Sequence, residues 1–221
     1  MTREIRAVRG MPGVFTDGAS LMTVNSAPGT TVYGERLFSS GGTEYRRWDP
    51  FRSKLAALIL LGGSGLGLDD GTKVLYLGAA SGTTASHVSD IVANGVVFCV
   101  EVSERSFRDL VKVCESRKNM IPILEDANRP EEYSHMIDGI ELVYQDIAQR
   151  NQVDIFVRNM AAFDAERGIL MLKSRSVDVN RQPKDIFAEV KRQLVARQLK
   201  VKSVTNLERY AKDHAAFVVE A

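Results

Sequence analysis

Residues 74–84 read VLYLGAASGTT, and this stretch decides the fold of the chain. Four apolar residues typical of a buried strand are followed by a glycine turn and by threonines that can begin a helix. In a doubly wound sheet, ligands bind at the carboxyl ends of the strands, where the first such turn comes close to them. Glycine permits this approach because it has no side chain. The stretch therefore predicts a strand, a ligand-binding turn and a helix, with a plain tight turn as the alternative.

Strands and helices are expected to alternate from this point to the end of the chain. Apolar runs predict strands at 74–77, 96–100, 120–124, 142–144, 168–173, 201–207 and 215–219. Helical patterns occur at 83–93, 104–116 and 183–197, and a further helix is expected to end at about residue 151. Residues 155–157 fit either a strand or a helix. Apolar strands separated by helices predict an α/β fold, doubly wound, with a mostly parallel sheet covered on both faces.

The first part of the chain has a different pattern. Short β segments are expected at 14–15, 21–24 and 31–33, with glycine and proline turns between them. This pattern predicts a small β-rich N-terminal domain over residues 1–48, followed by a second domain over 49–221. The second domain is expected to begin with a helix, because Asp49 can cap it and Pro50 suits the first helical position.

The glycine turn differs from that of a dinucleotide-binding protein in an informative way. Counted from Gly78, the second and third glycine positions of the G-x-G-x-x-G pattern hold Ala80 and Thr83. Residues with side chains at these two positions make the turn poorly suited to the close backbone contact with a pyrophosphate. Glu101 ends the second strand about 20 residues further on, where a carboxylate accepts hydrogen bonds from ribose hydroxyls. A cofactor with a nucleoside and no phosphates fits these features, and S-adenosylmethionine is one, with its carboxylate at the helix start near Thr83 and Thr84.

Further acidic residues stand at the ends of the next strands. Asp126 and Ala127 follow the third strand, where they are expected to meet the adenine edge. Asp146 ends the fourth strand next to the same site. Capping of a following helix is the alternative for each acid taken alone. Acids at successive strand ends favour a shared site.

Charge and composition limit the classes of function. The chain has 221 residues, with 29 basic and 28 acidic side chains and a net charge of +1. A protein that holds nucleic acid through many phosphates is usually basic, so an RNA-binding role here needs locally placed basic residues or partner molecules. No apolar run of about 18 residues and no apolar leader segment are present, which favours a cytoplasmic protein without membrane spans. Cys99 and Cys114 are expected to be buried reduced thiols, and no metal site is expected.

Several segments of the chain carry a resemblance to one family. They are EYRRWDPFRSKL at 44–55, LGAASGTTASHVSD at 77–90, YQDIAQ at 144–149 and KSRSVD at 173–178. The sequence resembles the fibrillarin family in its short archaeal form, over nearly the whole chain. The pairing of GAASGTT with a later QDIAQ is specific.

The resemblance implies a fold and a function. The fold is the S-adenosylmethionine-dependent methyltransferase type with a small N-terminal β domain. The activity is ribose 2′-O-methylation of rRNA and, in archaea, of tRNA, within box C/D ribonucleoproteins where a guide RNA selects the target. A Nop-type scaffold protein and a kink-turn-binding protein of ribosomal type are the implied protein partners.

The resemblance also assigns site residues. The implied cofactor contacts, besides Gly78 in the turn, are Thr83, Thr84, Glu101, Val102, Asp126, Ala127, Asp146, Ile147, Ala148 and Gln149. The implied catalytic set is Lys54, Asp146, Lys173 and His214, with the histidine replacing a glutamate. A lysine of lowered pKa can take the proton of a ribose hydroxyl while an acid holds it in place. Ordinary surface charge is the alternative for the lysines, and a structural role is the alternative for His214.

Basic residues near these positions suggest a strip that contacts phosphates, with a solvated surface as the alternative. They are Arg46, Arg47, Arg52, Lys173, Arg175, Arg181 and Lys184. Two features depart from the family. The arginine- and glycine-rich tail of its eukaryotic members is absent, and Arg209 stands where the family usually has proline.

Two other functions stay open at this point. A methyltransferase for proteins or small molecules can use the same fold. A non-catalytic ribonucleoprotein subunit can bind the same cofactor or RNA. The implied set of two lysines and an aspartate favours the RNA ribose methyltransferase, because many small-molecule enzymes need no such pair of lysines. The target nucleotides would be encoded in the guide RNA rather than in this chain.

Overall fold

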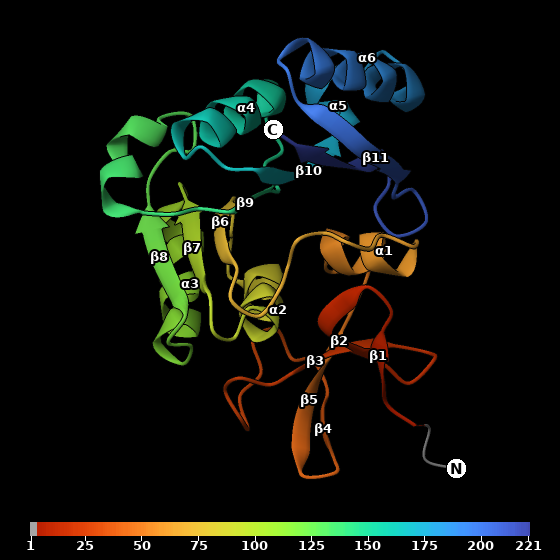
Figure 1. The fold of residues 1–221 in the computed structure, drawn as a ribbon, viewed down its shortest axis with the longest axis vertical. Helices are drawn as coiled ribbons and strands as arrows, with labels where there is room; N and C mark the ends of the chain where they lie inside the picture. Colours follow the sequence, from red (N-terminus) through yellow and green to blue (C-terminus); the bar gives the residue numbers. More distant parts are fainter. Residues whose placement is uncertain (1–3) are drawn as a thin grey trace.

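The computed structural model describes residues 4–221, so the first three residues of the expected N-terminal β domain lie outside the described residues. Two sheets make up the molecule, and Figure 1 shows them with helices α1 and α2 between them. The smaller sheet has the strand order β1-β2-β3-β5-β4, and the larger one has the order β11-β12-β10-β9-β6-β7-β8. The predicted α/β fold with a β-rich N-terminal part is confirmed. The exact division into domains at residue 48 stays a prediction.

The smaller sheet is antiparallel throughout its described strands. Its strands are β1 (Arg6–Val8), β2 (Met11–Thr16), β3 (Leu21–Val24), β4 (Leu37–Ser40) and β5 (Thr43–Trp48). The strand expected at 31–33 is wrong. The backbone N–H groups of Val32 and Tyr33 donate to the carboxylate of Glu35 instead of to a neighbouring strand. That segment is therefore a loop, and the strands come later, as the hairpin of β4 and β5.

The larger sheet is mostly parallel. Its strands are β6 (Lys73–Leu77), β7 (Val96–Glu101), β8 (Met120–Leu124), β9 (Leu142–Gln145), β10 (Arg167–Lys173), β11 (Lys200–Asn206) and β12 (His214–Glu220). Strands β10, β9, β6, β7 and β8 pair in parallel, and β12 runs antiparallel between β10 and β11. Parallel strands need crossover connections, and the helices supply them.

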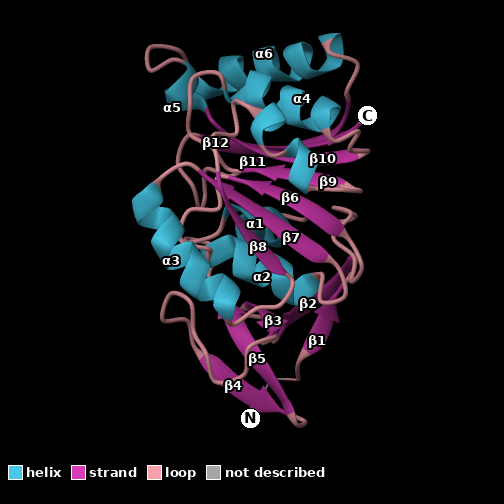
Figure 2. Ribbon diagram, turned by 90° about the vertical axis from the view of Figure 1, so that its left-hand side faces the viewer, coloured by secondary structure: helices cyan, strands magenta, loops and turns pink. Residues whose placement is uncertain are grey.

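Helices cover both faces of the larger sheet (Figure 2). They are α1 (Lys54–Leu60), α2 (Thr83–Ile91), α3 (Glu104–Glu115), α4 (Gln152–Ala162), α5 (Ser174–Val177) and α6 (Pro183–Ala196), with short 3-10 turns η1 (Pro130–Glu132) and η2 (Ser134–Met136). One apolar core joins α1, α2 and α3 to the sheet and to the N-terminal strands. A second core packs α4 and α6 on the opposite face. The strands are therefore buried from both sides, as their continuous apolar runs predicted.

Two helix starts differ from the sequence-based expectation. Helix α1 is capped by Ser53, whose hydroxyl accepts the N–H of Ala56, and not by Asp49. Asp49 instead closes a turn by accepting the N–H of Phe51. No helix precedes residue 151 after β9 in the described chain; α4 begins at Gln152, and the ambiguous residues 155–157 lie within it. Both segments hold polar residues that can cap or turn, which is why the pattern placed the starts several residues early.

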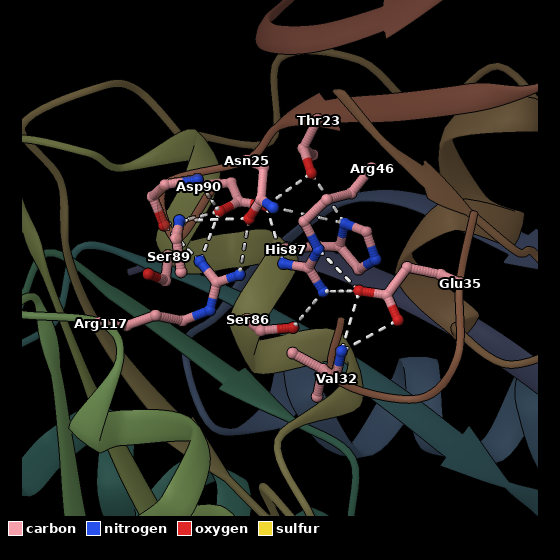
Figure 3. Close-up of polar contacts among 12 residues, drawn as sticks. Thr23, Asn25, Val32, Glu35, Arg46, Ser86, His87, Ser89, Asp90 and Arg117 are labelled. Atoms are coloured by element: carbon pink, nitrogen blue, oxygen red, sulfur yellow. Dashed lines mark hydrogen bonds and ion pairs between the residues drawn. The ribbon is translucent and has the colours of Figure 1, made fainter. Parts of the chain in front are cut away.

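A buried cluster of ionic side chains joins the N-terminal sheet to helix α2 (Figure 3). Arg46 of β5 donates to Glu35 at 2.7 Å and to Asp90 of α2 at 2.9 Å. Arg117, which follows α3, reaches the other oxygen of Asp90 at 2.6 Å. The side chains of Arg46, Asp90 and Arg117 are 0% exposed. Arg46 therefore does not belong to a surface strip of phosphate contacts, contrary to the expectation.

The cysteines only partly match their prediction. Cys99 is buried in β7, as expected, whereas Cys114 on α3 is half-buried because the helix lies at the surface. Burial raises the pKa of the Cys99 thiol well above its usual value. No helix among residues 4–221 is long and apolar enough to span a membrane.

Candidate active site

The strand order creates a crevice at the centre of the larger sheet. Strand β6 lies between β7 on one side and β9 on the other, and ligands of doubly wound folds bind at such a reversal of strand order. The N–H of Asp146 donates to the carbonyl of Leu77 at 2.9 Å, which brings the loops after β6 and β9 together. A Cβ on Gly78 would lie 2.7 Å from the Asp146 carbonyl oxygen, and its φ is +79°. Glycine is required there by both the contact and the backbone conformation.

A hollow of about 230 Å³ opens between these loops. It is lined by Gly78, Ala80, Val100, Glu101, Val102, Glu125, Asp126, Ala127, Asp146, Ile147, Ala148 and Gln149. Nine of the eleven residues expected to contact the cofactor are in this set. Their convergence comes from loops that follow β6, β7, β8 and β9, which are separated by tens of residues in sequence but end at the same edge.

Thr83 and Thr84 lie outside this hollow. The hydroxyl of Thr84 donates to that of Ser53 at 3.0 Å, so its side chain faces helix α1 and is 7% exposed. Thr83 borders a separate hollow, which Arg52 also lines. Both threonines still form the first turn of α2, whose backbone N–H groups are directed toward the glycine turn. Their assignment to the cofactor stays a prediction.

Glu101 is held in a fixed position. One carboxylate oxygen accepts the N–H of Ala80 at 2.8 Å, and the other accepts the N–H of Ser103 at 2.8 Å. The residue is 9% exposed. Each oxygen keeps a further lone pair, so the carboxylate can accept two hydroxyl groups of a ribose. Ala80 takes part through its backbone, at a φ of +49°.

The loops after β8 and β9 are joined by Asn128. Its backbone and side-chain nitrogens both donate to Asp126 at 2.9 Å, and these bonds lower the pKa of that carboxyl. Its side chain also contacts the amide oxygen of Gln149 at 3.2 Å. Sequence reasoning did not single out Asn128, because its role depends on two loops whose approach only the fold creates.

The charge of the hollow indicates what it can bind. Among the described residues that line it, four are acidic and none is a lysine or arginine. A pyrophosphate would be repelled by such a lining, whereas a cofactor with positive groups is attracted. S-adenosylmethionine carries a sulfonium and an ammonium group, and Glu101 offers its ribose a carboxylate. The residues present therefore fit the expected cofactor.

An ion pair lies at the edge of this hollow. The Lys54 ammonium donates to both oxygens of Asp146, at 2.8 and 2.9 Å. The side chains of Lys54 and Asp146 are 26% and 20% exposed. Lys54 is the first residue of α1 and Asp146 follows β9, so two predicted catalytic residues from distant segments are brought into contact.

The other two predicted catalytic residues are neighbours on adjacent antiparallel strands. Lys173 at the end of β10 pairs with His214 at the start of β12. Burial lowers the pKa of His214, and the hydrogen bond to the Lys212 carbonyl opposes this shift. The Lys54 and Lys173 cations also lower the pKa, whereas the Asp146 carboxylate raises it. The four predicted residues therefore form one neighbourhood.

Hydrogen bonds fix the tautomer of His214 and the end of β10. His214 Nδ1 lies 2.6 Å from the carbonyl oxygen of Lys212. A carbonyl can only accept, so the neutral imidazole carries its proton on Nδ1 and has a lone pair on Nε2. The side chain of Gln152 bonds both the N–H and the carbonyl of Lys173, at 3.0 and 3.1 Å. Gln152 is another residue that the sequence pattern does not indicate.

The expected basic strip is interrupted. Arg175 pairs with Asp213 at 3.2 Å, and Arg181 pairs with Glu189 at 2.5 Å. Arg46 is also buried, so the exposed members of the strip that form no ion pair among the described residues are Arg47, Arg52 and Lys184.

Comparison with known proteins identifies the family of this chain. The family model described as Fibrillarin matches residues 5–221. The chain belongs to the fibrillarin family. A fibrillarin-like rRNA/tRNA 2′-O-methyltransferase of Methanothermobacter thermautotrophicus is 50% identical over 218 residues, which is 98% of this chain and 97% of the relative. A relative of the same name from Methanopyrus kandleri is 46% identical, over 94% of this chain and 91% of the relative.

Solved fibrillarin structures have the same fold as this family member. The Methanococcus jannaschii fibrillarin, a pre-rRNA processing protein, superposes with a TM-score of 0.92 at 37% identity, over 98% of this chain and 97% of that one. Aeropyrum pernix fibrillarin with natively bound S-adenosyl-L-methionine gives a TM-score of 0.89 at 39% identity, over 98% and 97%. A chain from a fibrillarin/Nop5p complex gives 0.88 at 38% identity, over 95% and 98%.

Proposed function

We propose that this chain transfers a methyl group from S-adenosylmethionine to ribose 2′-hydroxyls of rRNA and tRNA. One observation carries the proposal: an acid-lined hollow at the centre of the sheet opens beside the Lys54–Asp146 ion pair. Relatives that share about half of its residues over almost their full length carry the matching name. A small-molecule or protein methyltransferase would not need the group of two lysines, an aspartate and a histidine.

The cofactor is held by the strand-end loops. Glu101 accepts the ribose hydroxyls, Asp126 and Ala127 meet the adenine edge, and Gly78 permits close approach of the backbone. Val102, Ile147, Ala148 and Gln149 complete the walls, and the start of α2 at Thr83 and Thr84 receives the amino-acid carboxylate. When bound, S-adenosylmethionine supplies an activated methyl group on its sulfonium.

We call the four predicted catalytic residues the catalytic group: Lys54, Asp146, Lys173 and His214. This group positions the ribose and removes the proton of its 2′-hydroxyl. Asp146 holds Lys54 through both oxygens, which leaves one ammonium N–H to orient the 2′-hydroxyl. Lys173 adds a second cation beside His214. A ribose hydroxyl is a poor nucleophile until its proton leaves, and the free Nε2 lone pair of neutral His214 can accept that proton. In-line positioning then supplies much of the remaining rate enhancement.

We further propose that the chain works inside a box C/D ribonucleoprotein. Its 29 basic residues face 28 acidic ones, so it lacks the charge for tight binding of RNA by itself. A Nop-type scaffold protein docks the enzyme, a kink-turn-binding protein anchors the guide RNA, and the guide selects the rRNA or tRNA target. The related fibrillarin/Nop5p complex supports the scaffold. Tethering raises the effective concentration of substrate, so the intrinsic affinity can stay low.

The test compares methyl transfer to a guide-paired target RNA with and without the scaffold protein, at about 150 mM salt. We expect site-specific transfer by the assembled complex and little by the isolated chain. Equal, site-specific transfer by the isolated chain would contradict the partner proposal. An assembled complex that binds S-adenosylmethionine but gives no single turnover would identify a non-catalytic subunit instead.

A further inference from the structure

Helix α4 begins at a glutamine that is fully buried. Gln152 is 0% exposed, and the helix packs on strands β9 and β10 (Figure 2). A buried amide loses its water from both the nitrogen and the oxygen, so its burial is costly unless protein atoms replace those hydrogen bonds. The partners of the Gln152 amide therefore show what this side chain holds together.

The amide group of Gln152 bonds two segments that are distant from each other in sequence. Its nitrogen donates to the carbonyl of Gln149 at 2.9 Å and to the carbonyl of Lys173 at 3.1 Å. Its oxygen accepts the N–H of Lys173 at 3.0 Å. Both amide protons and the oxygen are thus used. The side chain joins the end of β10 to the loop of residues 146–151 between β9 and α4, which we call the β9 loop.

The backbone of Gln152 is fixed to the other end of the same loop. Gln145, the last residue of β9, donates its side-chain amide to the carbonyl of Gln152 at 2.6 Å, and Gln145 is also 0% exposed. The β9 loop is therefore attached to Gln152 at two points, just before Asp146 and at Gln149.

These bonds begin where the pairing of the two strands ends. Strands β9 and β10 pair as far as Gln145 and Leu170, three residues before Lys173. Beyond that pair, the N–H and the carbonyl of Lys173 bond the Gln152 amide instead of a neighbouring strand. The side-chain amide thus takes the place of a peptide group of β9, which has already left the sheet.

The two joined segments carry different parts of the proposed chemistry. The β9 loop holds Asp146, which pairs with Lys54, and it supplies Gln149 to the wall of the cofactor hollow. Strand β10 ends at Lys173, which lies beside His214. The position of Lys173 relative to the cofactor therefore depends on the bonds of Gln152.

We propose that Gln152 is a positioning residue for methyl transfer, which fixes Lys173 relative to the bound cofactor. The inference rests on the proposed function, and it gives Gln152 no contact with the cofactor or the ribose. A displacement of about 1 Å at a reacting group can lower a rate by about 100-fold. Gln152 acts through its neighbour, so its loss should affect the chemical step more than binding.

Gln152→Met tests this split. Methionine is similarly long and unbranched, but it cannot replace the three amide hydrogen bonds. In the assembled complex, kcat should fall by about tenfold or more, because Lys173 is no longer held in place. The KM for target RNA and the affinity for S-adenosylmethionine, the latter measured by calorimetry, should each change by less than about threefold.

Asn119→Leu is the matched control. The Asn119 amide also donates to two backbone carbonyls, those of Ser89 and Val92, each at 2.9 Å. It directly precedes β8, at the end of the sheet opposite the site. This variant should lose stability and keep the wild-type kcat.

A double-mutant cycle shows whether Gln152 acts through Lys173. In the Lys173→Ala background, Gln152→Met should lower single-turnover transfer by no more than about twofold, because the side chain that it positions is already gone. A purely structural role would give the same loss in both backgrounds.

Amide hydrogen exchange supplies a readout that needs no activity. In Gln152→Met the Lys173 N–H should exchange about tenfold faster or more, and the Asp146 N–H of the β9 loop should also exchange faster. The control should leave both rates unchanged. This measurement reports the coupling of the two segments whether or not RNA is methylated.

Two results would overturn the inference. One is a wild-type kcat in folded Gln152→Met, and the other is an equal loss in both backgrounds of the cycle. Failure of the proposed function has a different signature, namely that the wild-type complex itself does not methylate RNA. Faster exchange in Gln152→Met would then still show that Gln152 holds Lys173 to the β9 loop, whereas unchanged exchange would remove that role as well.

Discussion

Two aspartates of this fold bind basic side chains in opposite surroundings. Asp90 meets Arg46 and Arg117 inside the molecule, with every one of these side chains 0% exposed. Asp146 meets Lys54 at the edge of the cofactor hollow, where 20% and 26% of the side chains remain exposed. Each contact joins segments that are far apart in sequence, but only the second is open to a ligand.

Their hydrogen bonds explain the difference. Asp90 accepts from the backbone and hydroxyl of Ser26 and from Thr23, besides its two arginines, so its oxygens are fully used (Figure 3). In the described chain the Asp146 carboxylate accepts from Lys54 alone. A saturated buried pair stabilises one structure, whereas an unsaturated exposed pair keeps capacity for a substrate.

Asp90→Ala should have the largest effect, on stability. The change leaves two buried guanidinium groups without their shared carboxylate, and breaking such a pair costs about 3–5 kcal/mol of unfolding free energy. Urea unfolding measures this loss. Asp109→Ala is the control, because its pair with Lys112 is 60–72% exposed and should contribute less than about 1 kcal/mol. Similar losses in both variants would mean that burial does not distinguish the two kinds of pair.

Asp146→Ala should do the reverse: little loss of stability and a large loss of rate. Single-turnover methyl transfer in the assembled complex should fall by about 100-fold or more, because Lys54 loses the carboxylate that positions it. Cofactor binding is also expected to weaken, since Asp146 lines the hollow. A variant that unfolds as readily as Asp90→Ala, at an unchanged rate when folded, would make this pair structural.

Lys173→Ala separates chemistry from cofactor binding. Lys173 faces His214 and does not line the hollow, so the affinity for S-adenosylmethionine should be retained while transfer falls by about 100-fold. Calorimetry and single-turnover transfer provide the two measurements. Methylation at the wild-type rate by the assembled variant would show that this lysine is ordinary surface charge.

Glu101→Ala should affect binding rather than chemistry. Removing the carboxylate that is fixed by Ala80 and Ser103 should weaken S-adenosylmethionine binding by about 1–3 kcal/mol. Glu115→Ala, at the exposed end of α3, is the control and should bind normally. Calorimetry also gives the sharper check: tighter binding of NAD than of S-adenosylmethionine would contradict the cofactor assignment.

The sequence pattern predicts the fold and the convergence of the site, for a physical reason. Apolar runs and a glycine turn are local, and the carboxyl ends of parallel strands must meet at one edge, so the pattern alone places Glu101, Asp126 and Asp146 together. The same pattern does not predict the contact of Lys54 with Asp146. Helix α1 precedes the sheet in sequence, and no periodicity indicates where it packs relative to the strand ends. The resemblance to fibrillarins supplies that contact.

What the pattern misses depends on tertiary contacts. From the sequence, Arg46 looks like a surface charge beside Arg47. Successive side chains of a strand point to opposite faces, so when β5 packs on α2 Arg46 points inward and Arg47 points outward. Asn128 and Gln152 have no local signal, since each bonds a loop or strand that is distant in sequence. The loop at 31–33 has a β-like composition, but Glu35 takes its backbone N–H groups.

The smallest expected effect is a change of stability with pH in the buried ionic cluster around Asp90. His87 of α2, which contacts this cluster through Thr23, is the residue that titrates. Thr23 donates its hydroxyl proton to Asp90, so the contact between that hydroxyl and His87 Nδ1, at 2.8 Å, requires the proton to lie on Nδ1. Burial lowers the pKa of His87 well below 6.5, and the nearby Arg46 and Arg117 cations lower it further. A neutral imidazole is therefore part of the folded structure.

The sign of the pH dependence follows from this lowered pKa. Above about pH 6.5 the folded and unfolded chains both carry a neutral His87, and its contribution to stability is fully present. Below that pH the unfolded chain binds a proton that the folded chain resists, so stability falls by up to about 1.4 kcal/mol per pH unit. The contribution of His214 to stability has the same sign. Its loss ends once the pH drops below the folded pKa of His214, because both states are then protonated.

Urea unfolding between about pH 5 and 7 measures the free energy of unfolding against pH. The slope should be shallower for His87→Asn than for the wild type, since asparagine can still donate to Thr23 and does not titrate. Identical slopes in the two proteins would mean that His87 binds its proton equally well in the folded and unfolded chains. Burial would then not lower the pKa of His87.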